Sequence, residues 1–515
     1  MLNVRVPERS ILDKIGPRLR ALWDLSIPEI REYAGVHEYD GEVLDLSPSG
    51  LSSGVKRLDT PGQSAAEPDP HDEAHMRAAE AGWRTAIQLG ELHRWNPLVH
   101  IDNLDLACYD REYAPQAERA AARAAHLSKW PDAIDASLES LDRVPAPVAA
   151  SLLSGTRGLA AGITDEKALA AHARLVGRLE AAVANGPAEC ALGAGVLARL
   201  LGDPEGMPVD LGRLEVRADR ERNRLLERLA TDCARYRTGA RPAELIPELL
   251  ADHPDDEGIY AAARQLIGEI TEFTLKQDLL PDPGGECLVG PAPESRRWAM
   301  AMMSPGGAYE AEAPAWYFVN PPDPSWSAEE QEEWRAVFSA TTLPAITAHE
   351  VTPGHFAHQR MIMRIERSHV RRSLASAAFV EGWAHYCEEL LVEEGFREED
   401  PRYAIGVWLE ALVRVTRLAC ALGIHAGTMS VADATRRFET DAFLQGQAAQ
   451  AEANRGAYDP TYGRYTWGKL EILALRDEAM AEWGNRYSHR RFHEALLGLG
   501  APPLGTIGDV LGEAG

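Results

Sequence analysis

Two histidines and a glutamate lie within nine residues of one another, in the stretch Thr347-Ala-His-Glu-Val-Thr-Pro-Gly-His355. Imidazole nitrogens are common ligands of divalent metals, and a carboxylate beside them can accept a proton from a metal-bound water. His349 and His355 are therefore predicted as metal ligands. Glu350, next to the first of them, is predicted as the general base.

The spacing of the two histidines does not fit a regular helix. In the common zinc-binding pattern the second histidine follows the first by four residues, one helical turn away. Here that place is Pro353, and six residues separate His349 from His355, which is about 240° around an ideal helix. Pro353 and Gly354 can distort the helix, since proline cannot donate to the helical ladder and a π-type widening absorbs residues. We expect a bent helix; the alternative is a helix that ends at 352–354, with two unrelated surface histidines.

A third ligand is expected from an amphipathic helix over residues 379–392. Catalytic sites of this kind use three protein ligands and leave one position open for water. Glu381 is the candidate ligand, and His385 and Glu388 share its helical face, where they could orient the ligand or its water. The alternative for Glu388 and the glutamates after it is an ordinary solvated acidic face.

In these two segments the sequence resembles the bacterial DUF885 family. The family patterns His-Glu-x-x-Pro-Gly-His and Glu-Gly-Trp-Ala-x-Tyr-x-Glu-x-Leu occur here at 349–355 and 381–390, and weaker likeness, such as Tyr465-Thr-Trp-Gly-Lys469, extends over nearly the whole chain. The family is grouped with the zinc metallopeptidases and likened to helical carboxypeptidases. The resemblance implies a mainly α, metallopeptidase-like fold with a central cleft, and a metal-dependent hydrolase more firmly than any substrate.

Three positions depart from the family pattern. His358 stands where glutamine is usual, Ala421 occupies a position that is commonly aspartate, and His385 fills the variable place of the second motif. None of them removes an expected ligand. The Ala421 departure does imply the loss of a carboxylate that would support a ligand.

The chain has 515 residues, a formal net charge of −26 and 45% apolar residues, enough for one large domain or a few ordinary ones. It has no apolar run of about eighteen residues and no apolar signal core near its start. Its six scattered cysteines fit a reducing cytosol, and its acidity disfavours nucleic acids and anionic membranes. We therefore expect a cytoplasmic protein without nucleic-acid or membrane partners, and the oligomeric state stays open.

Two halves are expected to form one integrated fold around a cleft. Residues 1–279, with apolar residues at helical spacing, are predicted as a helical scaffold half, interrupted by a Pro-, Gly- and Ser-rich loop over 41–70. Residues 280–515 are predicted as the metal-site half. In that half the apolar runs at 298–303 and 315–320, bounded by turn formers, predict a small sheet near the metal helix.

Two further patterns leave alternatives open. The run Ala315–Asn320, with Tyr317, could be an edge strand to which an extended peptide substrate adds, or a plain structural hairpin. The motif His71-Asp-Glu-Ala-His75 also places two histidines one helical turn apart and is a rival metal motif. Its acidic residues equally suit a helix N-terminus.

The predicted mechanism is hydrolysis of a peptide or small amide by a metal-activated water. Glu350 would take the water's proton and give it to the leaving amine. The resemblance places Tyr465 and His425 near the site, where both could donate to the oxyanion. Basic residues could hold a substrate carboxylate, as in a carboxypeptidase: Lys469, Arg464, Arg417 and Arg414.

Zinc is the expected cofactor, although the same ligands also hold manganese or cobalt. Two other functions remain open. One is a metal-dependent amide or ester hydrolase of a small non-peptide metabolite. The other is a helical binding protein that retains the site without turnover.

Overall fold

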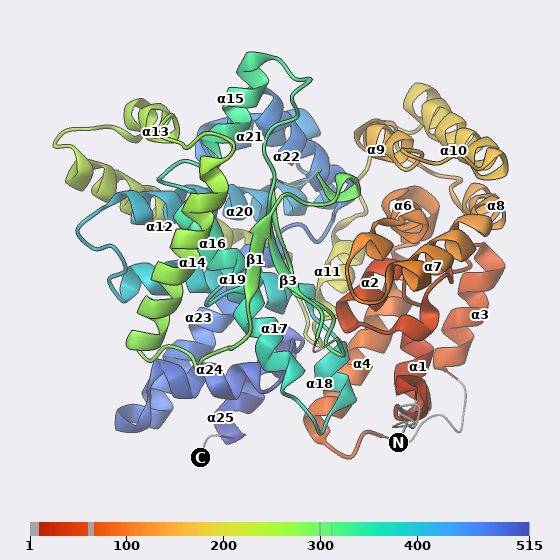
Figure 1. The fold of residues 1–515 in the computed structure, drawn as a ribbon, viewed down its shortest axis with the longest axis horizontal. Coiled ribbons are helices and arrows are strands. Elements are labelled where there is room, and N and C mark those ends of the chain that lie inside the picture. The colour runs from red at the N-terminus through yellow and green to blue at the C-terminus, as the bar shows by residue number, and fades with distance from the viewer. Residues whose placement is uncertain (1–9, 60–65, 298–299, 311, 514–515) are drawn as a thin grey trace, which may run out of the picture. The chain divides into compact units, whose positions relative to one another are not determined.

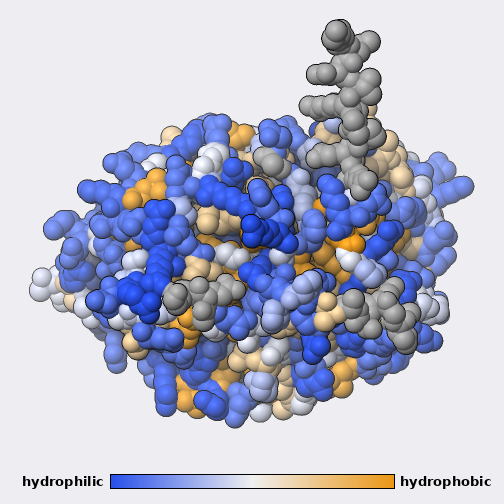
Figure 2. Space-filling model, turned by 90° about the horizontal axis from the view of Figure 1, so that it is seen from below, coloured by the Kyte–Doolittle hydropathy of each residue, from blue (hydrophilic) through white to orange (hydrophobic). Residues whose placement is uncertain are grey.

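The computed structural model describes residues 10–59, 66–297, 300–310 and 312–513. Helices dominate these residues and one small sheet accompanies them, which confirms the mainly α prediction (Figure 1). No described helix is both long enough and apolar enough to cross a bilayer. The face drawn in Figure 2 is mostly hydrophilic, with scattered hydrophobic patches, as suits a chain with a net charge of −26.

The first compact unit comprises Met1–Ala188, Gly306–Ala313 and Glu366–Leu374. Its α-helices are α1 (Pro17–Trp23), α2 (Pro28–Ala34), α3 (Pro48–Leu58), α4 (Pro70–Arg84), α5 (Leu92–Trp95), α6 (Leu98–Leu104), α7 (Gln116–Ser128), α8 (Trp130–Ser140), α9 (Ala146–Gly158), α10 (Glu166–Asn185) and α18 (His369–Ser373). Short 3₁₀-helices η1 (Ile11–Asp13), η2 (His37–Tyr39) and η4 (Ala107–Asp110) and the π-helix η3 (Thr85–Leu89) join them.

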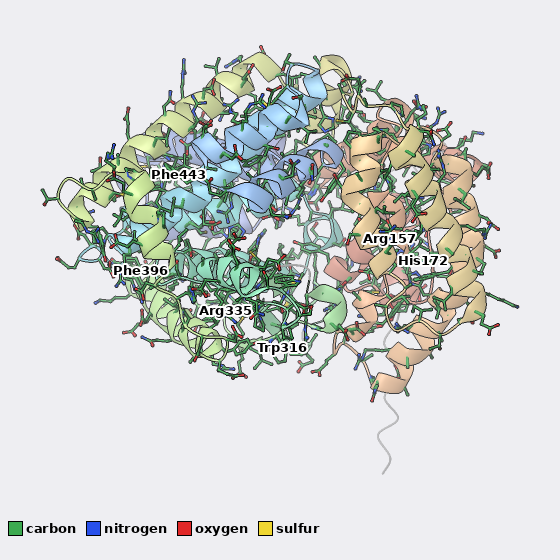
Figure 3. The ribbon with its side chains drawn as sticks, turned by 90° about the horizontal axis from the view of Figure 1, so that it is seen from above. Arg157, His172, Trp316, Arg335, Phe396 and Phe443 are labelled. Atoms are coloured by element: carbon green, nitrogen blue, oxygen red, sulfur yellow. The ribbon has the colours of Figure 1, made fainter. Side chains whose placement is uncertain are left out.

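Helices α8, α9 and α10 form the main core of this unit. Trp130, Ile134 and Leu179 are fully buried there. Figure 3 labels Arg157 on α9 and His172 on α10, where the two helices lie side by side. The buried imidazole of His172 bonds the Thr156 carbonyl across this contact at 2.7 Å, so its polar atom does not go unsatisfied.

Helix α3 lies within the segment that was predicted as a loop. Ser47 caps it by accepting a hydrogen bond from the Gly50 N–H, and Pro48 occupies the first turn, where its missing donor costs nothing. The prediction of an uninterrupted loop over 41–70 was wrong because Ser-Pro followed by Ser-Gly also suits the start of a helix. Residues 60–65 lie outside the described residues.

The second compact unit comprises Glu189–Pro305, Pro314–Ile365 and Ala375–Gly515. Its α-helices are α11 (Ala194–Gly202), α12 (Leu211–Tyr236), α13 (Pro242–Leu250), α14 (Gly258–Lys276), α15 (Ala328–Ala336), α16 (Leu343–Glu350), α17 (His355–Met363), α19 (Ala377–Glu393), α20 (Arg402–Ala426), α21 (Val431–Asp441), α22 (Gly446–Tyr458), α23 (Arg464–Trp483), α24 (His489–Leu497) and α25 (Val510–Glu513). Short 3₁₀-helices are η5 (Glu294–Arg296), η6 (Gly484–Arg486) and η7 (Leu504–Asp509). Helices α11 to α14 fall within residues 1–279 but pack in this unit, so the compact units do not coincide with the expected halves.

Two helix pairs form the centre of the second unit. Helix α12 packs on α20, and its buried face repeats every three or four residues and includes Leu214, Leu225 and Leu229. Helices α19 and α23 approach more closely, because Gly382 and Gly468 face each other. A Cβ on Gly382 would lie 2.5 Å from the Gly468 backbone, so a larger residue would push the helices apart.

The sheet contains β1 (Cys287–Gly290), β2 (Ala301–Ser304) and β3 (Ala315–Val319) in the order β1-β3-β2. Strand β3 pairs in parallel with β1 and antiparallel with β2. The prediction of a small sheet is confirmed, although residues 298–299 of the expected first run lie outside the described residues. The edge-strand hypothesis for Ala315–Asn320 is wrong, because β3 is the central strand and both of its sides are already paired.

Candidate metal centre

The two histidines of the motif stand at the ends of two different helices. Helix α16 ends at Glu350, directly after His349, and α17 begins at His355. The turn between them contains a cis peptide bond before Pro353. It also needs Gly354, since a Cβ there would lie 1.8 Å from the His349 carbonyl oxygen. The expected bent helix with a π-type widening is therefore wrong: the helix ends, and a tight turn brings the histidines back together.

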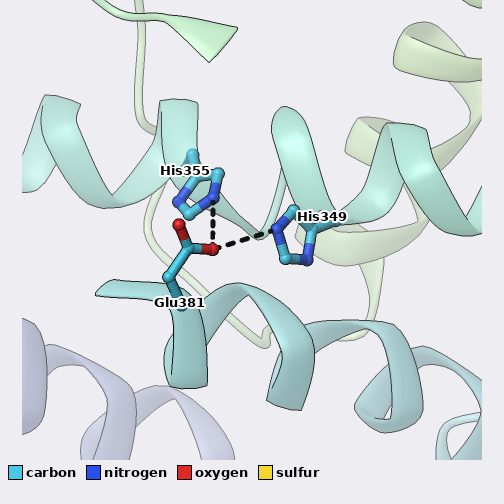
Figure 4. Close-up of side chains that lie close together, drawn as sticks. All are labelled: His349, His355 and Glu381. Carbon is cyan, nitrogen blue, oxygen red and sulfur yellow. Dashed lines mark ion pairs between the residues drawn. The ribbon is translucent and has the colours of Figure 1, made fainter. Parts of the chain in front are cut away.

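Glu381 of α19 completes a cluster with these histidines (Figure 4). Its Oε2 atom lies 3.5 Å from Nε2 of His349 and 3.5 Å from Nε2 of His355. The two rings are nearly perpendicular, at 88°, with centroids 4.7 Å apart. Zinc–ligand bonds of ~2.0–2.1 Å in tetrahedral geometry separate ligand atoms by roughly 3.3–3.5 Å. The spacing of these three side chains thus fits a small divalent metal.

The cluster is closed on one side and open on the other. The exposed fractions of the side chains are 6% for His349, 15% for His355 and 23% for Glu381. A fourth ligand, such as water or substrate, could approach from the side of Glu381 and His355. Catalytic metal sites keep such an open position, whereas structural ones are usually closed by four protein ligands.

A buried carboxylate supports His349 from behind. The Nδ1–H of His349 donates to Oε1 of Glu388 at 2.6 Å, so Nε2 is the nitrogen that faces the cluster. Burial would raise the pKa of Glu388, but Arg414 and His385, each 3.4 Å away, hold it well below its usual range. Glu388 is therefore an anion that fixes the orientation of the imidazole.

Glu388 was the residue whose role the sequence left open. The alternative that Glu388 and Glu389 belong to a solvated acidic face is wrong, because both are buried. The useful signal was the spacing of seven residues, two helical turns, between Glu381 and Glu388. The Ala421 departure also does not leave His349 without a supporting carboxylate, since Glu388 supplies one.

Without a metal, His349 holds an additional proton. Burial lowers the pKa of His349, but hydrogen bonds to Glu381 and Glu388 outweigh it and raise the value to about 9. Burial works in the opposite direction on Glu381, whose pKa is nevertheless held far below normal by the two histidines. A metal would take the place of this proton, because histidine binds metals in its neutral form.

Glu350 adjoins a predicted ligand in the chain, and Tyr465 lies close enough to Glu381 to feel its charge. Glu350 is the last residue of α16 and is partly exposed beside His349. Burial raises the pKa of Tyr465, at the start of α23, and the nearby charge of Glu381 raises it further. No described residue accepts or donates a hydrogen bond at the Tyr465 hydroxyl, so this donor is available to a substrate.

Lys469 is paired with two buried glutamates and does not contact the metal ligands. Its fully buried Nζ lies 2.8 Å from Glu221 and 2.7 Å from Glu389. The prediction that it holds a substrate carboxylate is therefore wrong, because both neighbouring carboxylates already neutralise it. The ion pair instead ties α12 and α19 to α23.

His425 and Tyr317 are also fully buried. The Nε2 of His425 bonds the Gly456 carbonyl at 2.8 Å. Eleven residues of α20 separate His425 from Arg414, or roughly 16 Å along the helix. Tyr317 is fully buried with its hydroxyl 3.4 Å from Thr347, so it packs the sheet on α16. The predicted oxyanion role of His425 and substrate contact of Tyr317 are wrong for these reasons.

The arginines of the prediction differ in what they bind. Arg417 forms two hydrogen bonds of 2.7 Å with Glu452, and Arg414 pairs with Glu388 and Glu410. Among the described residues Arg464, beside Tyr465, forms hydrogen bonds only through its Nη1, with Asp459 and Thr461. Arg464 therefore keeps unused donors near the metal cluster.

The rival motif lacks a third ligand. Among the described residues, ligand atoms of three suitable side chains lie within 4.8 Å of one another at His349, His355 and Glu381, and at no other place. His71 and His75 are buried with ring centroids 6.4 Å apart. Burial, with help from His71 and Arg371, lowers the pKa of His75 to about 3, so the His75 ring is a neutral side chain of the core.

Comparisons with known proteins agree with this architecture. Residues 156–511 match the family model described as "Bacterial protein of unknown function (DUF885)". The structure of a "putative lipoprotein of unknown function" from Shewanella oneidensis superposes with a TM-score of 0.78 at 20% identity, over 96% of this chain and 98% of that one. A "putative lipoprotein" from Colwellia psychrerythraea gives 0.73 at 16% identity, over 97% of each chain. Both share the fold, and no curated protein matches this chain in sequence.

Proposed function

We propose that this chain, which belongs to the DUF885 family, is a metal-dependent hydrolase. The most economical form of the proposal is a zinc peptidase, carboxypeptidase-like, that cleaves peptide or amide bonds. The observation that carries it is the cluster of two imidazole nitrogens and a carboxylate oxygen at metal-ligand spacing, partly open to solvent.

His349, His355 and Glu381 would hold the metal, which suits zinc and also manganese or cobalt. When bound, such a metal lowers the pKa of a water molecule and polarises a carbonyl. Glu350 would accept a proton from the attacking water and pass it to the leaving amine. The Tyr465 hydroxyl would donate to the oxyanion, and Glu388 keeps the His349 ring in its binding orientation.

Metal analysis and a peptide-library digest of the purified protein test this proposal together. We expect about one zinc-class ion per chain, and peptide cleavage that falls about 10²- to 10⁴-fold in Glu350→Gln while the metal content stays unchanged. Glu398→Gln, an exposed glutamate outside the site, is the matched control and should cleave at the wild-type rate. Absence of both metal and cleavage would leave a helical binding protein as the better explanation.

Hydrolysis of a small amide or ester is the second candidate. It is favoured by the central place of β3 in the sheet, since that strand offers no free edge to an extended peptide. Turnover of small chromogenic esters without peptide cleavage would identify this activity. The cytoplasmic location stays a prediction. Because the solved relatives are described as lipoproteins, cell fractionation should test the envelope as well.

A further inference from the structure

Two tyrosines and three arginines form a cluster next to the metal site, which we call the Arg–Tyr cluster: Arg417, Arg455, Tyr462, Arg464 and Tyr465. Arg417 lies over both tyrosine rings, 4.7 Å and 5.3 Å from their centroids. Arg455 lies 4.4 Å from the ring centroid of Tyr462, and Arg464 lies 5.6 Å from that of Tyr465. Stacking on aromatic faces keeps guanidinium groups in place without using their hydrogen-bond donors.

The cluster adjoins the metal ligands through two helices. Tyr465 lies one turn before Gly468, and Gly468 touches Gly382, the neighbour of Glu381. On α20, Arg417 lies one turn after Arg414, which contacts Glu388 behind His349. A substrate whose scissile bond is at the metal ligands would thus have a neighbouring group near these arginines.

The cluster holds more positive than negative charge. Glu452 accepts two hydrogen bonds from Arg417 and one from Tyr462. Asp459 bonds Arg464 and lies 3.9 Å from Arg455, so two arginines share one carboxylate. Three guanidinium groups therefore face two carboxylates within the cluster. The next negative charge near Arg464 is Glu381, which already pairs with the two histidines of the metal site.

The surplus donors belong to residues that solvent can reach. The Arg455 side chain is 37% exposed, and its guanidinium makes no hydrogen bond with any described residue. Arg464 uses only Nη1, and Tyr465 has a free hydroxyl among the described residues. These groups could bind an incoming anion, since arginine forms paired hydrogen bonds with carboxylates.

We propose that Arg455, Arg464 and Tyr465 form a subsite for a carboxylate of the substrate. This inference rests on the proposed hydrolase and specifies its substrate class: peptides or N-acyl amino acids with a free carboxylate beside the scissile bond. The carboxylate belongs either to the C-terminus or to an acidic side chain, and both have the same chemistry at this subsite.

Calorimetric titration of zinc-loaded Glu350→Gln with three N-acetylated tripeptides tests the subsite without turnover. The probes are acetyl-Ala-Ala-Phe, its C-terminal amide, and acetyl-Ala-Ala-Glu amide. We expect the free acid to bind about tenfold or more tightly than the phenylalanine amide, as for other charge-assisted pairs. If the glutamate amide also binds more tightly than the phenylalanine amide, side-chain carboxylates are substrates as well.

Added substitutions assign the preference to the arginines. Arg455→Gln and Arg464→Gln should each reduce the ratio of the two dissociation constants several-fold, whereas Arg436→Gln, an exposed arginine on α21, should not. Arg464→Gln could misfold, because Arg464 also bonds Asp459. Arg455→Gln breaks no hydrogen bond to a described residue, so this variant keeps the test valid in that case. Any one of three results would overturn the subsite: the acid and the amides bind equally well, none of the probes binds, or the preference for the acid is unchanged in both variants.

Cleavage by the wild-type protein separates this inference from the proposed function. Equal kcat/KM for the free acid and its amide would overturn the subsite and leave the hydrolase standing. Binding that depends on the carboxylate, without cleavage of any probe, would support the subsite and count against the hydrolase.

Discussion

Replacing Glu388 with glutamine tests whether the carboxylate behind His349 contributes to metal binding. The His349 Nδ1 and Glu388 Oε1 atoms lie 2.6 Å apart in a fully buried contact. Glutamine has the same shape and can still accept the Nδ1 hydrogen, but it removes the negative charge that makes the imidazole a stronger ligand. Losing such a partner weakens metal binding about 10- to 100-fold, or roughly 1.4–2.8 kcal/mol.

Burial of the pair favours the upper part of that range. The pair is buried, so neither solvent nor salt screens its charge-assisted hydrogen bond. The substitution should nevertheless fold, because Arg414 keeps Glu410 as a partner at 3.1 Å and is not left as an unpaired buried charge.

Zinc affinity can be measured by competition with a chromophoric chelator, with Glu389→Gln as the matched control. Glu389 is the next residue and is also buried, but it binds Lys469 and Arg224 and touches neither histidine. Glu389→Gln should lower the unfolding temperature and leave zinc affinity unchanged. Wild-type affinity in Glu388→Gln would refute the role of the buried carboxylate, and equal losses in both variants would show a general loosening of α19.

Three further predictions concern the metal, the helix contact and pH. Chelator treatment should abolish hydrolysis and zinc should restore it; an unchanged rate would exclude a metal-dependent reaction. In thermal unfolding, Gly382→Ala should reduce stability by about 1–3 kcal/mol. The control Gly268→Ala places its Cβ in open space on α14 and should increase stability by about 0.5–1 kcal/mol. Burial raises the pKa of Glu205 from 4.5 to about 7, so its stabilising contribution is present below 4.5 and is lost as the pH rises through 7. The free energy of unfolding of the wild type should fall by on the order of 3 kcal/mol between pH 5 and 8, and that of Glu205→Gln should not. Denaturation curves in which the variant keeps the wild-type pH dependence would contradict this prediction.

The candidate ligands could be predicted from the sequence because metal chemistry restricts both residue type and spacing. His349, His355 and Glu381 all meet in the structure as expected. The path of the backbone between the two histidines could not be predicted in the same way. Pro353 and Gly354 showed that a regular helix was impossible, but a distorted helix and a turn both satisfy that condition, and only the close packing of Gly354 on His349 distinguishes them.

The roles of the basic residues were harder to predict, because a charge is neutralised by partners that are distant in sequence. Lys469 pairs with Glu221, which belongs to α12 and lies far earlier in the chain. Glu221 occupies the buried face of α12, and a glutamate on an otherwise apolar stripe is the one local sign of such a partner. Which arginine stays available is a property of the whole unit, so Arg455 could not be singled out from sequence.

The order of the strands in the sheet could not be predicted from the sequence either, and this order bears on how a substrate is recognised. Alternating apolar runs between turn formers indicate where strands form, but the order of strands depends on contacts that the runs do not contain. Strand β3 pairs on both sides, so its main-chain groups cannot bind a peptide. Our proposal therefore assigns recognition to side chains, namely Tyr465, Arg455 and Arg464, which keep donors that no described residue engages. A substrate selected by these groups would be distinguished by its charge more than by an extended backbone.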